Sequence, residues 1–177
     1  NGGGMQKKVS FLTGFPRSGN TLLSKILNQN KDIGTSGHSS LPDVLFNLDL
    51  IKSKNIYNNF KSDKDYNNIL TNIFNNYYKD WPQKYIIDRG EWATPANYAL
   101  LFKYFYQDIK IIFLLRNPID VIKSYIELCN NHPNFYINQQ YNELDKTSLH
   151  RTELEEKIEL IIKKGDFFDV SFFTYKN

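Results

Sequence analysis

A short apolar segment, a glycine-bounded loop and a helical segment follow one another near the N-terminus, and this succession constrains the fold most. Val9–Thr13 is a run of β-forming residues. The loop Gly14–Thr21 (GFPRSGNT) comes next, and residues 21–28 then place leucine and isoleucine at helical spacing. A glycine loop between a strand and a helix presents backbone N–H groups to an anion. The segment therefore predicts an anion-binding site.

A second strand, loop and helix lie in the middle of the chain. Lys110–Leu115 carries an unbroken apolar run, which predicts a strand buried on both faces of a parallel sheet, and Ile119–Leu128 follows as a helix. We also expect a loop over 30–42, helices over 44–51, 69–77, 95–106 and 153–164, strands over 85–87 and 170–175, and irregular structure over 132–145. Strands that alternate with helices predict an α/β fold, a three-layer α/β/α arrangement with a mostly parallel central sheet.

Length and composition limit the domain number and the location. The chain has 177 residues, of which 5–177 are expected to form one domain that is C-terminally incomplete, while 1–4 are interpreted as a cloning remnant. The single cysteine, Cys129, excludes an internal disulfide and favours the cytoplasm. No apolar run reaches about 18 residues, so no membrane span is expected. A net charge of +3 is too small to predict nucleic-acid binding.

The glycine loop matches the Walker A pattern of nucleotide triphosphatases at every position but one. Asn20 stands where that pattern has the lysine that reaches the β- and γ-phosphates. Arg17, inside the loop, offers a guanidinium that can hold a terminal anion through two hydrogen bonds. The simpler alternative is that Gly14 and Gly19 only shape a tight turn and that Arg17 is a solvated surface charge.

The loop also resembles the 5'-phosphosulfate loop of sulfotransferases that use 3'-phosphoadenosine 5'-phosphosulfate (PAPS). The likeness is to the arginine-bearing version found in tyrosylprotein and bacterial members. The resemblance implies a P-loop NTPase-like sulfotransferase fold, and a sulfotransferase-type nucleotide-binding domain over 5–177. It implies that Arg17 contacts the phosphosulfate, that no metal is required, and that further contacts come from Ser18, Gly19, Asn20 and Thr21.

The second motif, Leu115–Tyr125, resembles the 3'-phosphate segment of the same family. There an arginine that ends a strand and a serine eight positions later hold the 3'-phosphate, and the matching residues here are Arg116 and Ser124. A guanidinium at a strand end and a hydroxyl two turns into the next helix can converge on one anion. The alternatives are a salt bridge between Arg116 and Asp120 and an ordinary surface role for Ser124.

Sulfuryl transfer needs a base for the acceptor and cations near the transferred group. Arg89 resembles the family position that reaches the sulfuryl group, although it could instead pair with Asp88 or Glu91. His38 falls near the position of the family's base, and the usual pKa of histidine suits that role. Asp88 and Glu91 are the alternative bases, and an ordinary loop position is the simpler reading of His38. His132 and His150 lack ligand spacing, so no metal site is expected.

The sequence thus favours transfer of a sulfuryl group from PAPS to an acceptor hydroxyl or amine, with release of adenosine 3',5'-bisphosphate. The acceptor could be a small molecule, a glycan or a peptide, because substrate loops vary on a shared scaffold. One alternative is a P-loop kinase or NTPase with a degenerate Walker A loop, in which Asp88 would hold Mg²⁺. The other is a non-catalytic relative that binds nucleotide.

Overall fold

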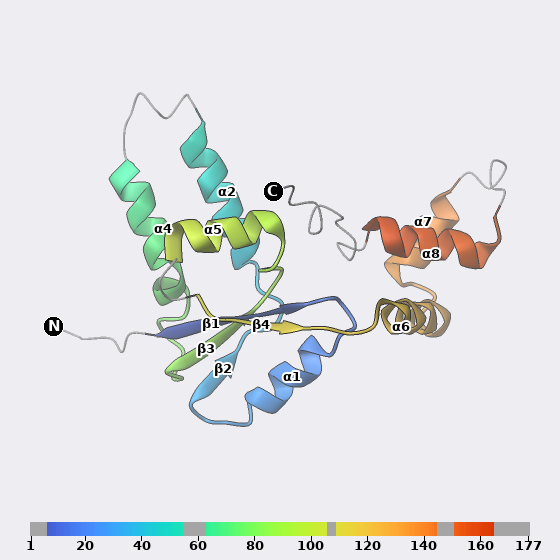
Figure 1. Cartoon of the computed structure of the whole chain (residues 1–177), viewed down its shortest axis with the longest axis horizontal. Helices are drawn as coiled ribbons and strands as arrows, with labels where there is room; N and C mark the ends of the chain where they lie inside the picture. The colour runs from blue at the N-terminus through green and yellow to red at the C-terminus, as the bar shows by residue number, and fades with distance from the viewer. Residues whose placement is uncertain (1–6, 55–62, 106–108, 145–150, 165–177) are drawn as a thin grey trace. The chain divides into compact units, whose positions relative to one another are not determined.

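The computed structural model describes residues 7–54, 63–105, 109–144 and 151–164 (Figure 1). The chain divides into two units. We call Asn1–Gly14 with Gly19–Leu114 the sheet unit, and Phe15–Ser18 with Leu115–Asn177 the helical unit. The glycine loop contributes to both, because its residues 15–18 belong to the helical unit. Each unit is described by itself.

The sheet unit is built on parallel strands. Its described strands are β1 (Lys8–Gly14), β2 (Ile33–Thr35), β3 (Tyr85–Arg89) and β4 (Ile111–Leu114). Their order is β2-β3-β1-β4, and each pair of neighbours runs parallel. The register pairs Leu12 with Arg89 and Gly14 with Leu114, so the carboxyl ends of β3 and β4 lie beside that of β1. Ligands of open parallel sheets bind at such ends.

Helices cover both faces of this sheet, as Figure 1 shows. Helix α1 (Asn20–Leu27) lies on one face, where it contacts β1, β2 and β3. The other face carries α2 (Leu41–Ser53), α4 (Asp63–Tyr77) and α5 (Pro95–Phe105), which contact one another. The predicted three-layer α/β architecture with a parallel sheet is confirmed.

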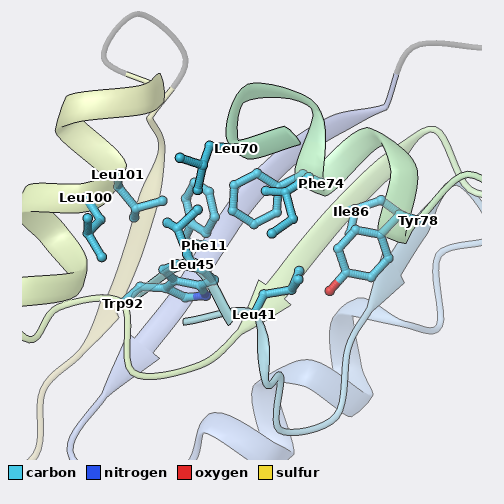
Figure 2. Close-up of a cluster of buried hydrophobic side chains, with 11 residues drawn as sticks. Phe11, Leu41, Leu45, Leu70, Phe74, Tyr78, Ile86, Trp92, Leu100 and Leu101 are labelled. Carbon is cyan, nitrogen blue, oxygen red and sulfur yellow. The ribbon is translucent and has the colours of Figure 1, made fainter. Parts of the chain in front are cut away.

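The core of the sheet unit lies between the sheet and the layer formed by α2, α4 and α5 (Figure 2). Its aromatic centre is Phe11 on β1, whose ring centroid lies 5.2 Å from that of Phe74 and 4.9 Å from that of Trp92. The fully buried members also include Leu45, Leu70, Tyr78, Ile86 and Leu101. Because Tyr78 and Trp92 carry polar atoms, a core that buries them must also supply hydrogen-bond partners.

The described helices of the helical unit are α6 (Pro118–Asn131), α7 (Tyr136–Glu143) and α8 (Glu153–Lys164). Their apolar sides meet in a second cluster made of Val121, Tyr125, Cys129, Ile137 and Ile161. Asn138 joins α7 to the end of α6, because its side-chain amide donates to the carbonyls of Cys129 (2.8 Å) and His132 (3.1 Å).

Three expectations about local structure were wrong. The region 30–42 contains strand β2, and 132–145 contains helix α7. Both elements are short, and they form through tertiary contacts that the local pattern does not show. Ile112 and Phe113 of β4 are 37% and 40% exposed, because among the described residues β4 pairs only with β1. The strand expected over 170–175 lies outside the described residues.

Candidate anion-binding and transfer site

The two glycines of the loop occupy backbone conformations that other residues rarely adopt. Gly14 ends β1 with φ +154°, and a Cβ placed there would lie 2.5 Å from the carbonyl oxygen of Leu114. Gly19 has φ +98° and precedes α1, where its carbonyl accepts from the amide of Leu23 (2.9 Å). The turn between strand and helix therefore requires glycine at both ends.

Arg17, Arg116 and Ser124 form a hydrogen-bonded cluster in the helical unit. The Nε of Arg17 donates to the hydroxyl of Ser124 at 3.1 Å, and an Nη atom of Arg116 donates to the carbonyl oxygen of Arg17. Arg17 and Ser124 lie 107 positions apart in the chain. The fold therefore brings the arginine of the first motif onto the arginine and serine of the second. The cluster gathers two cationic groups and one hydroxyl, which suits an anion.

Local structure explains how this cluster is held. Asn117 caps α6, because its side chain accepts from the amide of Ile119 at 2.9 Å, and Pro118 begins the helix. Ser124 follows on the same helix. Phe15 packs against the apolar cluster of the helical unit, which anchors the loop two residues before Arg17. Arg17 itself has φ +63°, a left-handed conformation that costs a non-glycine residue energy.

The hydroxyl of Ser18 is buried and has no hydrogen-bond partner among the described residues. A buried polar atom in this state costs free energy unless a ligand or water satisfies it. An oxygen of a bound phosphate or sulfate would provide a partner. The residues present therefore fit an anionic ligand in the loop.

Asn20 and Thr21 are the first two residues of α1. The side-chain amide of Asn20 donates to the carbonyl of Gly14 (3.3 Å), so it joins the two ends of the loop. The hydroxyl of Thr21 accepts from Nη1 of Arg89 at 2.7 Å. The structure thus brings Arg89 of β3 to the first turn of α1, where the dipole of the helix favours negative charge.

Arg89 and His38 belong to the carboxyl end of β3 and the loop beside it. The Nε of Arg89 donates to the carbonyl of Gly37 at 3.1 Å, and His38 is the next residue, with an exposed side chain. Among the described residues Arg89 forms no ion pair with Asp88, and Arg116 forms none with Asp120. Neither of these two pairings therefore occupies a guanidinium group.

A comparison with known protein families decides the assignment. The model of the sulfotransferase family matches residues 10–175, which is nearly the whole chain. The chain belongs to the sulfotransferase family. No curated protein matches the sequence significantly. Membership supports sulfuryl transfer as the general chemistry of this sulfotransferase, and both motifs lie within the matched residues.

Asp88 of this sulfotransferase lies in the core, where neither proposed role for it suits its surroundings. Its side chain is 0% exposed, and its carboxylate accepts from Tyr78 (2.6 Å), Ser39 (3.0 Å) and Trp92 (2.8 Å). Burial raises the pKa of the carboxyl group, although the hydrogen bonds oppose that change. A carboxylate enclosed in this way is not open to an acceptor or to Mg²⁺. Glu91, the other alternative base, is exposed.

This buried network was not predicted from the sequence. A signal for it exists, because side chains alternate along a strand and Asp88 therefore shares the face of Ile86, a fully buried core residue. Trp92 also lies in the core of the sulfotransferase, with its ring against Phe11 and Phe74.

Neither a metal-binding cluster nor a membrane-crossing helix occurs among the described residues of the sulfotransferase. No cluster of three or more histidine, cysteine, aspartate or glutamate side chains there is arranged to bind a metal ion. None of the described helices combines the length and the apolar character that crossing a bilayer requires.

Proposed function

We propose that this sulfotransferase transfers a sulfuryl group from PAPS to an acceptor hydroxyl or amine and releases adenosine 3',5'-bisphosphate. The observation that carries the proposal is the cluster in which Arg17 bonds to Ser124 and Arg116 bonds to Arg17. Two motifs that are distant in sequence meet there with the donors that an anionic nucleotide requires. The family match supports the general chemistry, and the cluster supports the choice of donor.

In this proposal the two motifs bind different groups of PAPS. Arg116 and Ser124 hold the 3'-phosphate, and Arg17 holds the phosphosulfate. The backbone and hydroxyl groups of the loop add donors from Ser18, Gly19, Asn20 and Thr21. Ser18 supports this assignment, because its buried hydroxyl has no hydrogen-bond partner among the described residues.

Arg89 and His38 are proposed to act on the transferred group and the acceptor. PAPS supplies a sulfuryl group whose bond to a phosphate oxygen breaks on transfer. Arg89 is cationic and adjoins the first turn of α1, so it can stabilise the negative charge that develops there. His38 has an exposed imidazole in the neighbouring loop, and it takes the proton from the acceptor. The acceptor itself is a small molecule, a glycan or a peptide.

Calorimetric titration tests the choice of donor. The wild-type chain is titrated with adenosine 3',5'-bisphosphate, ATP and GTP, each with and without Mg²⁺. The proposal predicts binding of the 3'-phosphorylated nucleotide that does not depend on Mg²⁺. A preference for ATP or GTP with Mg²⁺ would contradict it and favour a kinase. Binding of the bisphosphate without sulfated product from any class of acceptor would favour a non-catalytic relative.

Single substitutions then test the cluster. Arg17→Ala and Arg116→Ala should each weaken binding of the bisphosphate by about 1.5–3 kcal/mol, or roughly 10- to 150-fold, the scale of charge-assisted hydrogen bonds. Lys123→Ala is the matched control, because it removes an exposed positive charge from α6 beside Ser124. Equal affinity in all three variants and the wild type would show that the site is assigned wrongly.

A further inference from the structure

The loop 36–39 is bonded to the carboxyl end of β3 at several points. The amide of Ser36 donates to the carbonyl of Ile87 (3.1 Å), and the hydroxyl of Ser36 accepts from the amide of Arg89 (2.7 Å). The amide of Ser39 donates to the carbonyl of Arg89 (2.8 Å), while Nε of Arg89 donates to the carbonyl of Gly37 (3.1 Å). Arg89 and this loop therefore form one hydrogen-bonded assembly, and His38 belongs to it.

Asp88 joins this assembly to the core. Its Oδ2 atom accepts from the hydroxyls of Ser39 and Tyr78, and its Oδ1 atom accepts from the indole of Trp92. Tyr78 and Trp92 belong to the buried core cluster (Figure 2). Ser39 belongs to the loop. The same carboxylate therefore bonds to two residues of the core and one of the loop.

A carboxylate at this position is costly for the core. Burial removes it from water, and apolar side chains of similar volume often fill such a position with equal or better stability. A core function alone could be met by apolar packing. Of the three bonds, the one to Ser39 reaches the loop that carries His38, and Arg89 follows Asp88 directly in the chain.

We propose that Asp88 is a positioning residue, which fixes the loop 36–39 through Ser39 and so orients His38 and Arg89 for the transfer reaction. The part that concerns the reaction rests on the proposed function. The role of the bond to Ser39 does not, because the order of the loop can be measured without nucleotide or acceptor. If Asp88 had only a structural role, loss of its bond to Ser39 and loss of its bond to Tyr78 should have the same effect on the order of the loop.

The variants Ser39→Ala and Tyr78→Phe separate the two bonds. Each removes one hydroxyl donor from the same oxygen of Asp88, the first on the loop side and the second on the core side. Amide hydrogen exchange is followed in both variants and the wild type at positions 36, 39 and 89. The amide of Leu41 is excluded, because it donates to the hydroxyl of Ser39 and would respond directly.

Ser39→Ala should raise exchange at these three amides at least tenfold more than it raises exchange in β1. Tyr78→Phe should lower the midpoint of thermal unfolding without a selective increase in the loop. Unchanged loop exchange in Ser39→Ala, or the same selective increase in both variants, would overturn the positioning role.

A kinetic measurement addresses the reaction. Release of adenosine 3',5'-bisphosphate from PAPS is followed with p-nitrophenol as the offered acceptor. Ser39→Ala should lower kcat at least tenfold and leave the Kd for the bisphosphate within twofold, whereas Tyr78→Phe should retain kcat. Equal kcat in Ser39→Ala and the wild type would overturn the catalytic part of the inference. A wild-type chain that neither binds nor releases the bisphosphate would contradict the proposed function, while the exchange result would still decide the positioning role.

Discussion

The end of β3 and the cluster around Arg17 both present cationic groups, but they are built in different ways. At the end of β3, Arg89 follows the fully buried Asp88 and is bonded to a loop whose Ser36 and Ser39 are buried. In the helical unit, Arg17 and Arg116 are exposed, and the bonds of their guanidinium groups go to members of the cluster itself. The end of β3 is held by hydrogen bonds to buried residues, whereas the guanidinium groups of the cluster around Arg17 are held by hydrogen bonds at the surface.

This difference has an energetic meaning. A hydrogen bond at the surface contributes little to folding, because water replaces it when it breaks. A bond to a buried carboxylate is expensive to remove, because the remaining groups stay buried without partners. Residues at the end of β3 should therefore affect stability when replaced, while residues of the cluster should affect nucleotide affinity. The two sites can be distinguished by measuring both quantities for each variant.

The largest effect on stability is expected for Asp88→Ala. The substitution leaves the donors of Ser39, Tyr78 and Trp92 without their partner in the core, so the free energy of unfolding should fall by about 3–5 kcal/mol. Urea denaturation measures the change. Asp32→Ala removes an exposed carboxylate and should change stability by no more than about 0.5 kcal/mol. Similar values for both variants would remove the distinction between the two sites.

The glycines of the loop should show the same contrast between packed and open positions. Gly14→Ala combines an unfavourable φ with a Cβ that meets the carbonyl of Leu114, so we expect a loss of about 3 kcal/mol or more. A Cβ at Gly19 meets nothing within 4 Å, so only its backbone conformation opposes alanine, with a loss of about 1–2 kcal/mol. Thermal unfolding of the two variants measures the difference. A larger loss at Gly19 would contradict the packing seen at the end of β1.

The pH dependence of stability offers a smaller effect that belongs to the end of β3 alone. Burial raises the folded pKa of Asp88 above its ordinary value of 3.8. The native state then binds more protons than the unfolded state above about pH 4, so the stability that this group contributes falls as pH rises toward the folded pKa. The slope is at most about 1.4 kcal/mol per pH unit.

Asp88→Asn removes this titration and should flatten the corresponding part of the pH profile. Arg116→Ala should leave the profile unchanged, because Arg116 belongs to the helical unit and takes no part in the hydrogen bonds of Asp88. Chemical denaturation between pH 4 and 8 gives the three profiles. A wild-type stability that rises with pH relative to that of Asp88→Asn would contradict this prediction and show that the hydrogen bonds to the carboxylate outweigh its burial.

The sequence predicted the parts of the fold that depend on local pattern. The strand, loop and helix from β1 to α1, the parallel sheet, and helices α4, α5, α6 and α8 follow from apolar spacing and glycine positions. Strand β2 and helix α7 do not, because pairing with β3 and packing against α8 determine them.

The candidate site divides in the same way. The loop between strand and helix could be predicted from glycine spacing, and its anion-binding character stays a prediction. The bond between Arg17 and Ser124 was not predicted, because the resemblance to a family assigns the two residues to different anionic groups and no local rule relates residues 107 positions apart. The bond between Ser39 and Asp88 spans 49 positions and carries no motif, so the sequence alone gave no reason to join them.

The smallest predicted effect concerns the exposed cluster. Ser124→Ala removes one neutral hydroxyl, so affinity for adenosine 3',5'-bisphosphate should fall by about 1 kcal/mol, or roughly fivefold. Stability should change by no more than about 0.5 kcal/mol, because water can replace the hydroxyl as a partner of Arg17. Ser53→Ala, which removes another exposed helical hydroxyl, should change neither quantity appreciably. If Ser124→Ala lowers stability as much as Asp88→Ala does, the cluster supports the fold of the helical unit, and the contrast between the two sites fails.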